Sequence, residues 1–488
     1  MKRRDFIKAA GLQVAALLTG HGAVRTKRVA GAEMTERPNF LFILIDDMGW
    51  SDLPCYGNTF HETPNIDRLA QQGMRFTDAY AAGPVCSPTR ASILAGQYTA
   101  RTGITDFIPG HWRPWAKLIV PENRLQLPLE TITLAEALKA HGYACGHIGK
   151  WHLGGKGYGP EQQGFENVTG GVRSRNDKQV TSFTNSAIKF IEENKDVPFF
   201  LHLSHHTVHI PLEAPQQLVE KYERKLVSAQ RQAGAGPKPQ TGINNPVYAA
   251  MIEHLDNSTG HILKKLDELD LADSTMVVFF SDNGGLYKPY GGYGGDMSAV
   301  CSNAPLRGEK GTLYEGGIRE PLIVRWPGIV KPGSTCSAAV CSVDFYPTFL
   351  QAAGAKPDPN HTLDGETLLP LLALVSAERA GAGQTGGLQR DAIFWHYPHY
   401  HHSTPAGAIR RGKWKLIEFF EDGRLELYNL ESDIGEKQNL AKKMPERAAA
   451  LQRKLAAWRQ SVGAKLPTPN PDYDPAKAHE WQPRRRRR

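Results

Sequence analysis

The sequence predicts an α/β protein: a large, mostly parallel sheet sandwiched by helices, followed by a small C-terminal α+β domain carrying an antiparallel sheet. Three observations support this fold class. Continuous apolar runs such as Phe40–Ile45 are typical of strands buried on both faces of a parallel sheet. Segments with helical periodicity alternate with these runs along the chain. Beyond residue 390, shorter strand patterns flank a hairpin turn.

The large domain is built from strands and helices that alternate in order. Buried strands are expected at Phe40–Ile45, Tyr143–Ile148, Pro198–Leu203, Met276–Phe280 and Pro321–Trp326. Helices are expected at Asn65–Gly73, Thr133–His141 and Asn245–Leu269. The last of these is the longest, because apolar residues recur at helical spacing from Tyr248 to Leu269. This alternation predicts a sheet that helices cover on both faces.

The C-terminal part is predicted to form a separate, smaller unit. Residues 376–390 are rich in Gly, Ala and Gln and are interpreted as a linker or loop. Ala408–Phe419 and Arg424–Asn429 are expected to pair as strands around an Asp-Gly turn, and an amphipathic helix is expected after Pro445. The predicted organisation is a large domain at 33–375, the linker, a subdomain at 391–466 and a tail at 467–488.

Residues 1–32 have the features of an export signal. A basic start precedes the apolar segment Ala9–Leu18, which at about ten residues is shorter than the ~20 needed to cross a bilayer. Arg3-Arg4-x-Phe6-x-Lys8 resembles a twin-arginine signal, which exports folded proteins; the alternative is a chance arginine pair. Cleavage is expected near residues 30–32. The mature protein is therefore expected to be periplasmic or secreted in a bacterium, without stable membrane insertion.

The net charge of the protein is concentrated at its two ends. The 488 residues carry a formal charge of +8; residues 1–32 account for +6 and Arg484–Arg488 for +5, which leaves −3 for the rest. A slightly acidic body argues against nucleic-acid binding. The arginine run is interpreted as a solvated tail, with polyanion binding as the alternative.

The six cysteines show neither C-x-x-C pairing nor zinc-ligand spacing, and they are too few for a disulfide framework. Cys336 and Cys341 are close enough in sequence to bridge, but spacing alone does not establish a bond.

Two acidic pairs stand at the ends of predicted strands. Asp46 and Asp47 directly follow the first strand, and Asp282 and Asn283 follow the strand at Met276–Phe280. In open α/β sheets, ligands gather at the carboxyl ends of the strands. Four oxygen-bearing side chains suit a hard divalent cation. Either pair alone would equally suit a turn.

A cysteine precedes another helical pattern in the segment Cys86-Ser-Pro-Thr-Arg90. The simplest interpretation is a buried cysteine before a helix that begins near Pro88. Such a helix start would also place backbone N–H groups and Arg90 around Cys86, which favours an anion.

Lysine and histidine side chains follow the predicted strands as well. Lys150 and His152 lie in G-K-W-H-L-G and, two residues apart, share one face of an extended segment. His209 lies in H-I-P-L, and Lys310 lies in the glycine-rich segment Leu306–Gly317. Isolated residues of these types are usually surface residues, but here Lys150, His152 and His209 fall at the sheet edge where the acidic pairs are expected.

These motifs together resemble the type I sulfatases of the alkaline phosphatase superfamily, from about Asn39 to about Trp458. The resemblance rests on D-D, C-S-P-T-R, G-K-W-H-L-G, H-I-P-L, S-D-N-G-G and L-R-G-E-K-G-T-L-Y-E-G-G in that order. It implies an alkaline-phosphatase-like fold, a sulfatase catalytic domain at 33–375 and a sulfuric ester hydrolase. Val208 and Glu309 stand where the family usually has Pro and often has Gly, but neither change removes a reacting group.

The resemblance implies that a maturation enzyme oxidises Cys86 to formylglycine, whose hydrate is the nucleophile. A geminal diol keeps a second hydroxyl, whose deprotonation re-forms the aldehyde and expels sulfate, whereas a thiol or simple alcohol would retain a stable ester. By the same resemblance, one Ca²⁺ is bound by Asp46, Asp47, Asp282, Asn283 and the hydrate of position 86.

The remaining roles are also implied by the resemblance. Arg90 would orient the hydrate, and Lys150 and Lys310 would offset charge on the sulfuryl oxygens. His209 is the expected general acid for the leaving alcohol, and His152 the expected base for sulfate release.

The expected substrate is a sulfate monoester on a sugar, and the expected activity is arylsulfatase-like. The nearest alternative is a phosphate or phosphonate ester hydrolase of the same superfamily. An alternative of another class is a non-catalytic polyanion-binding protein that uses the arginine tail.

Aromatic and histidine side chains in polar segments are candidates for contact with a sugar. The aromatic candidates are Trp112, Trp115, Trp395 and Tyr397. They could stack on a sugar ring, or they could be ordinary packing within loops. The histidine candidates are His396, His399, His401 and His402. A role in a substrate pocket is the preferred interpretation, and a metal site or a surface loop are the alternatives.

Overall fold

A central sheet of nine strands organises the part of the chain described by the computed structural model, residues 37–169, 176–232, 244–289, 299–377 and 387–483. The strand order is β10-β2-β9-β8-β1-β7-β5-β6, and β11 also pairs with β2. The strands are β1 (Asn39–Ile45), β2 (Met74–Tyr80), β5 (Ala144–Gly149), β6 (Asn167–Thr169), β7 (Phe199–Ser204), β8 (Thr275–Ser281), β9 (Arg319–Arg325), β10 (Ser334–Cys336) and β11 (Val340–Cys341). Only β9 runs antiparallel to its neighbours, β8 and β2, so the predicted mostly parallel sheet is confirmed.

Apolar strands account for the position of this sheet at the centre of the fold. Every residue of β1, β7, β8 and β9 is buried. The side chains alternate between two core clusters, with Phe40 and Phe42 in one and Leu41 and Ile43 in the other. A strand that is buried on both faces is mostly apolar, and the apolar runs made these strands recognisable in the sequence despite buried polar residues such as His202 and Glu320.

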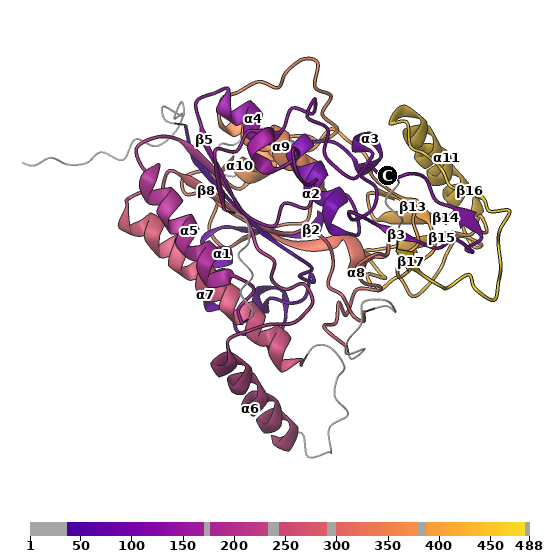
Figure 1. The fold of residues 1–488 in the computed structure, drawn as a ribbon, viewed down its shortest axis with the longest axis horizontal. Coiled ribbons are helices and arrows are strands. Elements are labelled where there is room, and N and C mark those ends of the chain that lie inside the picture. The colour runs from indigo at the N-terminus through magenta and orange to yellow at the C-terminus, as the bar shows by residue number, and fades with distance from the viewer. Residues whose placement is uncertain (1–36, 170–175, 233–243, 290–298, 378–386, 484–488) are drawn as a thin grey trace, which may run out of the picture. The chain divides into compact units, whose positions relative to one another are not determined.

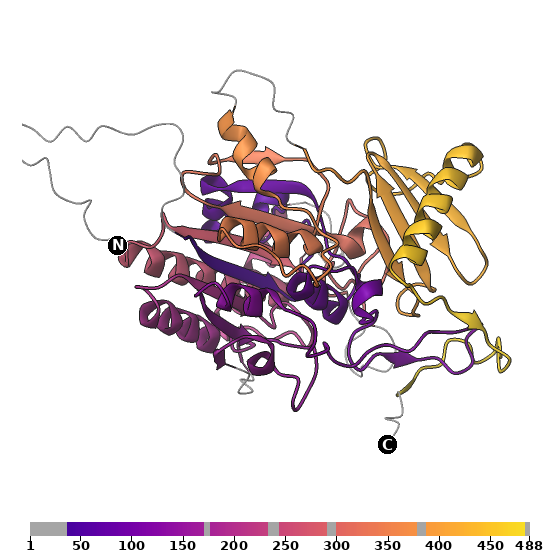
Figure 2. The same ribbon diagram turned by 90° about the horizontal axis from the view of Figure 1, so that it is seen from above.

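Helices cover both faces of the sheet, as Figures 1 and 2 show. One face carries α1 (Pro64–Gln72), α5 (Val180–Glu193) and α7 (Pro246–Glu268); the other carries α2 (Cys86–Ala95), α4 (Leu134–Lys139), α9 (Phe345–Ala352) and α10 (Leu369–Ala377). The remaining helices are α3 (Thr99–Thr102), α6 (Gln216–Gln232), α8 (Glu315–Ile318) and α11 (Pro445–Ser461). The three predicted helices are present within a few residues. Two of them begin at side-chain caps, Thr133 in a capping box and Asn245.

A second, antiparallel sheet forms the C-terminal subdomain, in the order β12-β13-β14-β15. Its strands are β12 (Ile393–Tyr397), β13 (Ala406–Arg411), β14 (Trp414–Phe419) and β15 (Leu425–Asn429), and α11 packs on one face. The hairpin of β14 and β15 is confirmed, but the single strand predicted at Ala408–Phe419 is wrong. The chain turns at Gly412, whose φ of 57° is left-handed, so that Arg411 pairs with Trp414.

The segment after residue 466 pairs with an earlier part of the chain. β16 (Thr468–Pro469) pairs with β4 (Leu118–Ile119), and β17 (Gln482–Pro483) pairs with β3 (His111–Trp112). Much of the predicted tail at 467–488 is therefore attached to the large domain. The predicted linker also differs at its start, because α10 continues to Ala377. The predicted signal at 1–32 and Arg484–Arg488 lie outside the described residues.

Candidate active site

The carboxyl ends of four neighbouring strands bring the sequence-predicted site residues together. Asp46 and Asp47 follow β1, Lys150 and His152 follow β5, His209 follows β7, and Asp282 and Asn283 follow β8. Because β5, β7, β1 and β8 are parallel and adjacent, these segments end at one edge of the sheet. Cys86, Arg90 and Lys310 reach the same edge from α2 and from the loop before α8.

The acidic side chains are directly connected to one another. The Asp47 backbone N–H donates to Asp282 Oδ1 over 3.2 Å, and Asn283 Nδ2 donates to Asp47 Oδ1 over 2.7 Å. Asp47 has a left-handed φ of 65°, a conformation that Asp tolerates better than most residues. Asp46, Asp47, Asp282 and Asn283 are each at most 2% exposed. The predicted pairing of the two acidic segments is therefore present in the structure.

Each carboxylate is matched by one cation. Lys150 Nζ lies 2.5 Å from Asp46 Oδ2, and Lys310 Nζ lies 2.7 Å from Asp47 Oδ1. Arg90 Nη2 lies 2.7 Å from Asp282 Oδ2, and a further Arg90 nitrogen donates to the Lys150 carbonyl. Three buried acids and three buried cations thus offset one another at the sheet edge.

Cys86 is the first residue of α2 and is 2% exposed. Its Sγ lies 3.1 Å from His152 Nδ1, and His152 Nε2 donates to the Ile108 carbonyl over 2.5 Å. Because the Nε2 proton is committed to Ile108, a neutral His152 presents Nδ1 to Cys86 as an acceptor. The predicted cysteine and base are therefore in contact. All six cysteines are free thiols in the structure, including Cys336 and Cys341.

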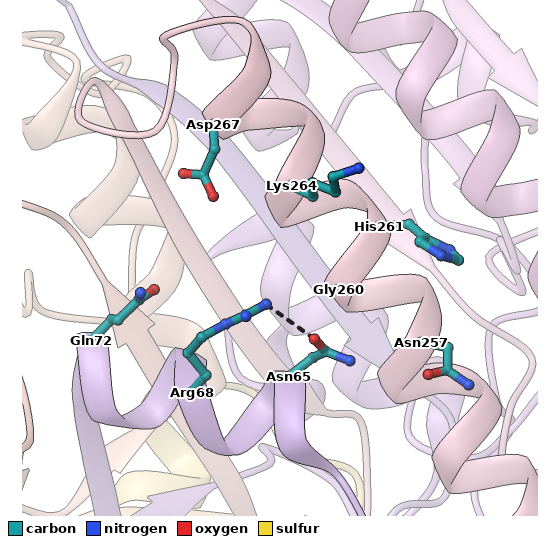
Figure 3. A pocket seen from close by; sticks show the side chains of 8 residues that line it. All are labelled: Asn65, Arg68, Gln72, Asn257, Gly260, His261, Lys264 and Asp267. Atoms are coloured by element: carbon teal, nitrogen blue, oxygen red, sulfur yellow. Dashed lines mark hydrogen bonds between the residues drawn. The ribbon is translucent and has the colours of Figure 1, made fainter.

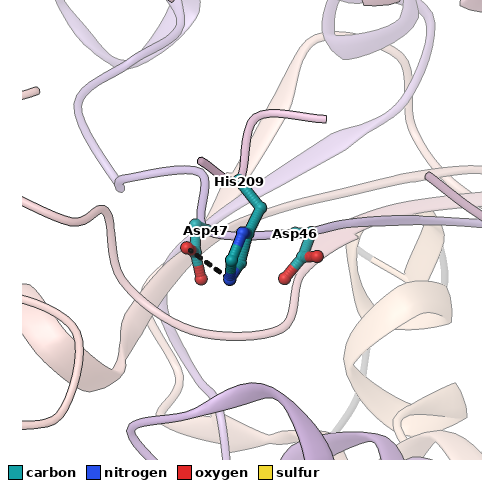
Figure 4. Close-up of side chains that lie close together, drawn as sticks. All are labelled: Asp46, Asp47 and His209. Carbon is teal, nitrogen blue, oxygen red and sulfur yellow. Dashed lines mark ion pairs between the residues drawn. The ribbon is translucent and has the colours of Figure 1, made fainter. Parts of the chain in front are cut away.

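His209 faces the acidic pair. Its Nε2 lies 3.7 Å from Asp47 Oδ2, and Figure 4 shows the imidazole between the carboxyl groups of Asp46 and Asp47. One ligand atom from each of these three residues lies within 4.8 Å of the others, so His209 could contribute to a metal site as well as to proton transfer. The loop is held by Val208, whose N–H donates to the Asp46 carbonyl over 2.7 Å; a proline at this position could not donate this bond.

The donor set fits a hard cation. Within the described residues, the buried atoms Asp46 Oδ1 and Asn283 Oδ1 accept no hydrogen bond. Buried acceptors left without donors are rare in folded proteins, and oxygen ligands are those that Ca²⁺ and Mg²⁺ select. The predicted ligands Asp46, Asp47, Asp282 and Asn283 therefore form a coherent oxygen-rich site.

The pKa values of the three acids of the site are shifted in different directions. Burial opposes ionisation of Asp46 and Asp47. Even so, Lys150 and His209 hold the pKa of Asp46 below its ordinary range, and Lys310 and His209 do the same for Asp47. Burial raises the pKa of Asp282 to about 7 even though Arg90 contacts it, with Asp46 adding to the rise. A cation among these oxygens would favour the ionised form.

The pKa values of His152 and His209 are both lowered. Burial, and then Lys150, lower the pKa of His152 to about 3; burial, and then Lys310, lower the pKa of His209 to about 4. Both rings are therefore neutral near pH 7 in the ligand-free site. Burial disfavours a charged lysine, but Asp47 raises the pKa of Lys310 above its ordinary value, and Asp46 does the same for Lys150.

Two aromatic residues considered for sugar stacking are core residues instead. Trp395 is fully buried in β12, where its Nε1–H donates to the Ala81 carbonyl over 2.8 Å. Tyr397 is 2% exposed and donates to Asp106 over 3.0 Å. The C-terminal sheet packs on the large domain through these rings, so the prediction that they stack on a sugar is wrong.

The histidines after β12 are distributed differently. His396 contacts the Lys465 carbonyl, away from the site, and His399 contacts Thr105. His401 and His402 lie against the Lys310 loop, with His402 Nδ1 2.9 Å from the Lys310 carbonyl. The latter two therefore border the candidate active site.

Two supporting groups were not predicted. The hydroxyl of Ser204 at the end of β7 contacts Arg90 and donates to the Lys150 carbonyl over 2.9 Å. A polar residue closing a buried strand is the signal that could have identified it. The Ile108 carbonyl that holds His152 carries no such signal, because it belongs to the backbone.

A surface pocket of about 400 Å³ lies elsewhere, between α1 and α7 (Figure 3). Arg68, His261 and Lys264 line it together with Asp267. None of its lining residues belongs to the cluster at the strand ends, so the pocket is separate from the candidate active site.

The alkaline-phosphatase-like α/β fold, with a cysteine, lysines, histidines and acids at one sheet edge, is that of sulfuric ester hydrolases. Comparison with family models agrees: residues 38–355 match the sulfatase family, and residues 308–461 match the family described as N-sulphoglucosamine sulphohydrolase, C-terminal. The chain belongs to the sulfatase family and is a sulfuric ester hydrolase.

Individual relatives cover most of the chain. A sulfatase of Formosa agariphila is 30% identical, with 94% of each chain covered. Human arylsulfatase A is 32% identical, over 84% of this chain and 85% of its own. The crystal structure of Ps i-CgsB in complex with k-i-k-neocarrahexaose superposes with a TM-score of 0.70 at 26% identity, covering 90% of this chain and 95% of that one.

Proposed function

We propose that this sulfatase removes sulfate from a sulfated carbohydrate, with a formylglycine made from Cys86 as the nucleophile. The observation that carries the proposal is the position of Cys86. It starts α2 beside Arg90 and His152, at the edge where the acids and lysines converge. A helix N-terminus and three cations favour an anionic group such as a sulfate ester.

The proposed chemistry uses two hydroxyls on one carbon. One hydroxyl of the position-86 hydrate loses its proton to solvent and attacks sulfur as the alkoxide. The bond from sulfur to the ester oxygen breaks as that oxygen takes a proton and leaves as the alcohol. The second hydroxyl then loses its proton, its lone pair re-forms the aldehyde, and sulfate departs with the bonding electrons. Water adds to the aldehyde and restores the hydrate.

The cation site is proposed to consist of Asp46, Asp47, Asp282 and Asn283, with position 86 as a further ligand. The unpaired oxygens of Asp46 and Asn283 support this assignment. We propose Ca²⁺ as the ion, one per chain. When bound, it would supply a positive charge that lowers the pKa of the hydrate and attracts a sulfate oxygen.

The buried cations position the sulfate in this proposal. Lys150 and Lys310 each contact a carboxylate of the site and could also donate to sulfuryl oxygens as negative charge shifts. Arg90, fixed by Asp282 and the Lys150 carbonyl, is proposed to orient the hydrate. Arginine suits this role because its planar fork holds several acceptors at once.

The histidines are proposed to move the protons. His209 Nδ1 donates to the Ile210 carbonyl, so Nε2 is the atom that would carry a proton to the leaving alcohol. His152 Nδ1, already 3.1 Å from Cys86 Sγ, is the proposed acceptor of the proton lost when the aldehyde re-forms. The low pKa of His209 makes its protonated form a strong acid, and an anionic substrate would raise the protonated fraction.

A carbohydrate substrate is supported by the relatives. Ps i-CgsB was crystallised with a neocarrahexaose, and the C-terminal family model is named for a sulphoglucosamine sulphohydrolase. The best test is a panel of sulfated sugars and aryl sulfates beside matched phosphate esters, assayed on matured enzyme. We expect kcat/KM to be higher for sulfate. Phosphate turnover that equals or exceeds sulfate turnover would favour a phosphate or phosphonate ester hydrolase.

Export and maturation complete the proposal. We propose a twin-arginine signal at residues 1–32, a periplasmic or secreted product, and a formylglycine-generating enzyme as the maturation partner. Within the described ranges, every helix is too short or too polar to cross a bilayer. Replacing Arg3 and Arg4 with Lys should retain the protein in the cytoplasm; normal export of that variant would contradict the twin-arginine assignment.

A further inference from the structure

The C-terminal strap, residues 466–483, lies along the segment 111–119, here called the ribbon. Two short strand pairs join them, and Asn470 Nδ2 donates to the Pro114 and Ala116 carbonyls over 2.8 and 2.7 Å. The strap lies beyond both matched family regions, which end at residues 355 and 461.

Ring contacts connect the strap to the active site. The Trp481 ring lies 4.5 Å from the His111 ring, and the Arg113 guanidinium lies 3.8 Å from the Trp481 ring centre. The His111 ring in turn lies 4.4 Å from Phe107 and 5.6 Å from His401. The strap thus touches the ribbon, and His111 of the ribbon touches His401 of the C-terminal subdomain.

The same contacts continue to the reacting groups. Ile108, next to Phe107, accepts the hydrogen bond from His152, which contacts Cys86. On the other side, a Cβ added to Gly311 would lie 2.0 Å from His401 Nδ1, so His401 packs directly on the residue after Lys310. Trp481 and His111 are therefore continuous with the walls of the active site.

The strap and the ribbon also expose apolar side chains. Of the eight large apolar side chains exposed among the described residues, four lie here: Trp112 at 41%, Ile119 at 50%, Leu466 at 52% and Tyr473 at 46%. A concentration of exposed apolar side chains beside an active site marks a binding surface. The half-buried Arg113 guanidinium lies 5.4 Å from the Tyr400 ring centre and 3.8 Å from that of Trp481, and so brings a positive charge to this surface.

We propose that the strap and the ribbon form a saccharide-binding surface continuous with the active site, which binds the sugar residues adjoining the sulfated one. Trp481, His111 and Arg113 would form its inner end and Trp112 and Tyr473 its outer end. Aromatic faces beside imidazole and guanidinium donors suit the apolar faces, hydroxyls and anionic groups of a sulfated saccharide chain. The inference rests on the proposed function and deepens it: the substrate is an oligosaccharide or polysaccharide.

The test is the variant Trp481→Ala, with Trp414→Ala as a matched control. Both tryptophans are half-buried and stacked with an arginine, Arg447 lying 4.2 Å from the Trp414 ring centre. For each enzyme, kcat/KM is measured on a sulfated hexasaccharide and on p-nitrophenyl sulfate. We expect Trp481→Ala to lower the ratio of the two values roughly tenfold, the equivalent of about 1.4 kcal/mol, mainly through KM. Trp414→Ala should leave the ratio unchanged.

A ratio within about twofold of the parent value would overturn the proposal. Losing even one binding contact worth ~1.4 kcal/mol would change the ratio tenfold, so a smaller change would mean that Trp481 does not bind the saccharide. The same conclusion would follow if Trp481→Ala instead changed the sedimentation coefficient, since the surface would then hold a second copy of the chain. Calorimetric binding of the hexasaccharide to Cys86→Ala, with and without Trp481→Ala, gives a readout that needs no turnover. If no sulfate ester is hydrolysed but Trp481 still governs binding, the proposed function fails and the binding surface stands.

Discussion

Two buried ionic clusters of equal formal charge lie within this molecule, and they differ in what their atoms leave unpaired. The site cluster contains Asp46, Asp47, Asp282, Arg90, Lys150 and Lys310. The bridging cluster contains Asp78, Glu315, Glu436, Arg319, Arg410 and Lys415, and it joins the large sheet to the C-terminal sheet. Each has three acids and three bases.

In the bridging cluster, Lys415 Nζ lies 2.8 Å from Glu315 and 2.9 Å from Glu436, and Arg410 lies 2.6 Å from Asp78. The site cluster keeps Asp46 Oδ1 and the neighbouring Asn283 Oδ1 without a hydrogen bond. In the bridging cluster, Glu436 Oε1 also accepts no hydrogen bond, but it lies 2.9 Å from a lysine ammonium, whereas Asp46 Oδ1 in the site cluster lies 3.9 Å from Arg90. Buried ion pairs alone therefore do not mark function in this protein. Acceptors left open at a strand-end edge distinguish the site, and four variants can test the difference.

The largest effect is expected from Cys86→Ala. Turnover of matured enzyme should fall by at least about 10³-fold, because the group that forms the covalent intermediate is lost. The melting temperature should change little, since one small side chain is removed. Steady-state kinetics and calorimetry on the same preparation measure both quantities. Substantial residual turnover would show that another residue is the nucleophile.

Asp282→Asn should lower activity roughly 100-fold while keeping an acceptor for Arg90. It should also reduce the rise in melting temperature produced by added Ca²⁺, because one anionic ligand is lost. Asp256→Asn is the control, since Asp256 is a buried carboxyl that accepts from Ile66 N–H at the start of α1. Equal Ca²⁺ responses in all three proteins would place the cation elsewhere.

Lys415→Met should act on stability and not on chemistry. Removing one partner leaves Glu315 and Glu436 buried beside each other without their shared cation, which typically costs about 3–5 kcal/mol. Denaturant unfolding measures this loss, and kcat per folded molecule should be retained. Lys413→Met is the control: its exposed pair with Glu431 should contribute less than about 1 kcal/mol. A Lys415→Met protein as stable as the parent would contradict the structural role of the cluster.

The effect of Asp52 should be seen only as a pH dependence of stability. Burial raises the pKa of Asp52 to about 7, although Tyr248 O–H and Gly49 N–H donate to it. The folded state therefore holds its proton more tightly than the unfolded state. The contribution of Asp52 to stability is present below pH ~4 and is lost as the pH rises toward 7, at about 1.4 kcal/mol per unit. Asp52→Asn should flatten this decline in unfolding free energy, and an unchanged slope would assign it to other groups.

Much of the fold could be predicted because its strands are buried on both faces. The apolar runs of β1, β7 and β8 and the polar residues directly after them identified the sheet and its functional edge. The Ala408–Phe419 error arose because the two-residue turn at Gly412 interrupts an otherwise continuous strand pattern. Gly412 was the local signal for this turn, since glycine adopts a left-handed φ readily.

Other features depend on contacts between distant segments. Trp395 and Tyr397 lie on either side of His396 in a short strand, and only the packing of the C-terminal sheet on the large domain shows that they are buried. The strap pairs through strands of two residues, which are too short for any periodicity. The Ile108 carbonyl that fixes His152 is a backbone atom, and no residue type encodes it.

The central claim is that Cys86 becomes the aldehyde that performs catalysis. Its most direct test is mass analysis of the tryptic peptide Phe76–Arg90 from protein produced with and without a formylglycine-generating enzyme, alongside sulfatase activity. We expect the aldehyde mass in active protein, with specific activity proportional to the aldehyde fraction. Fully active protein that carries only the unmodified thiol at position 86 would contradict it.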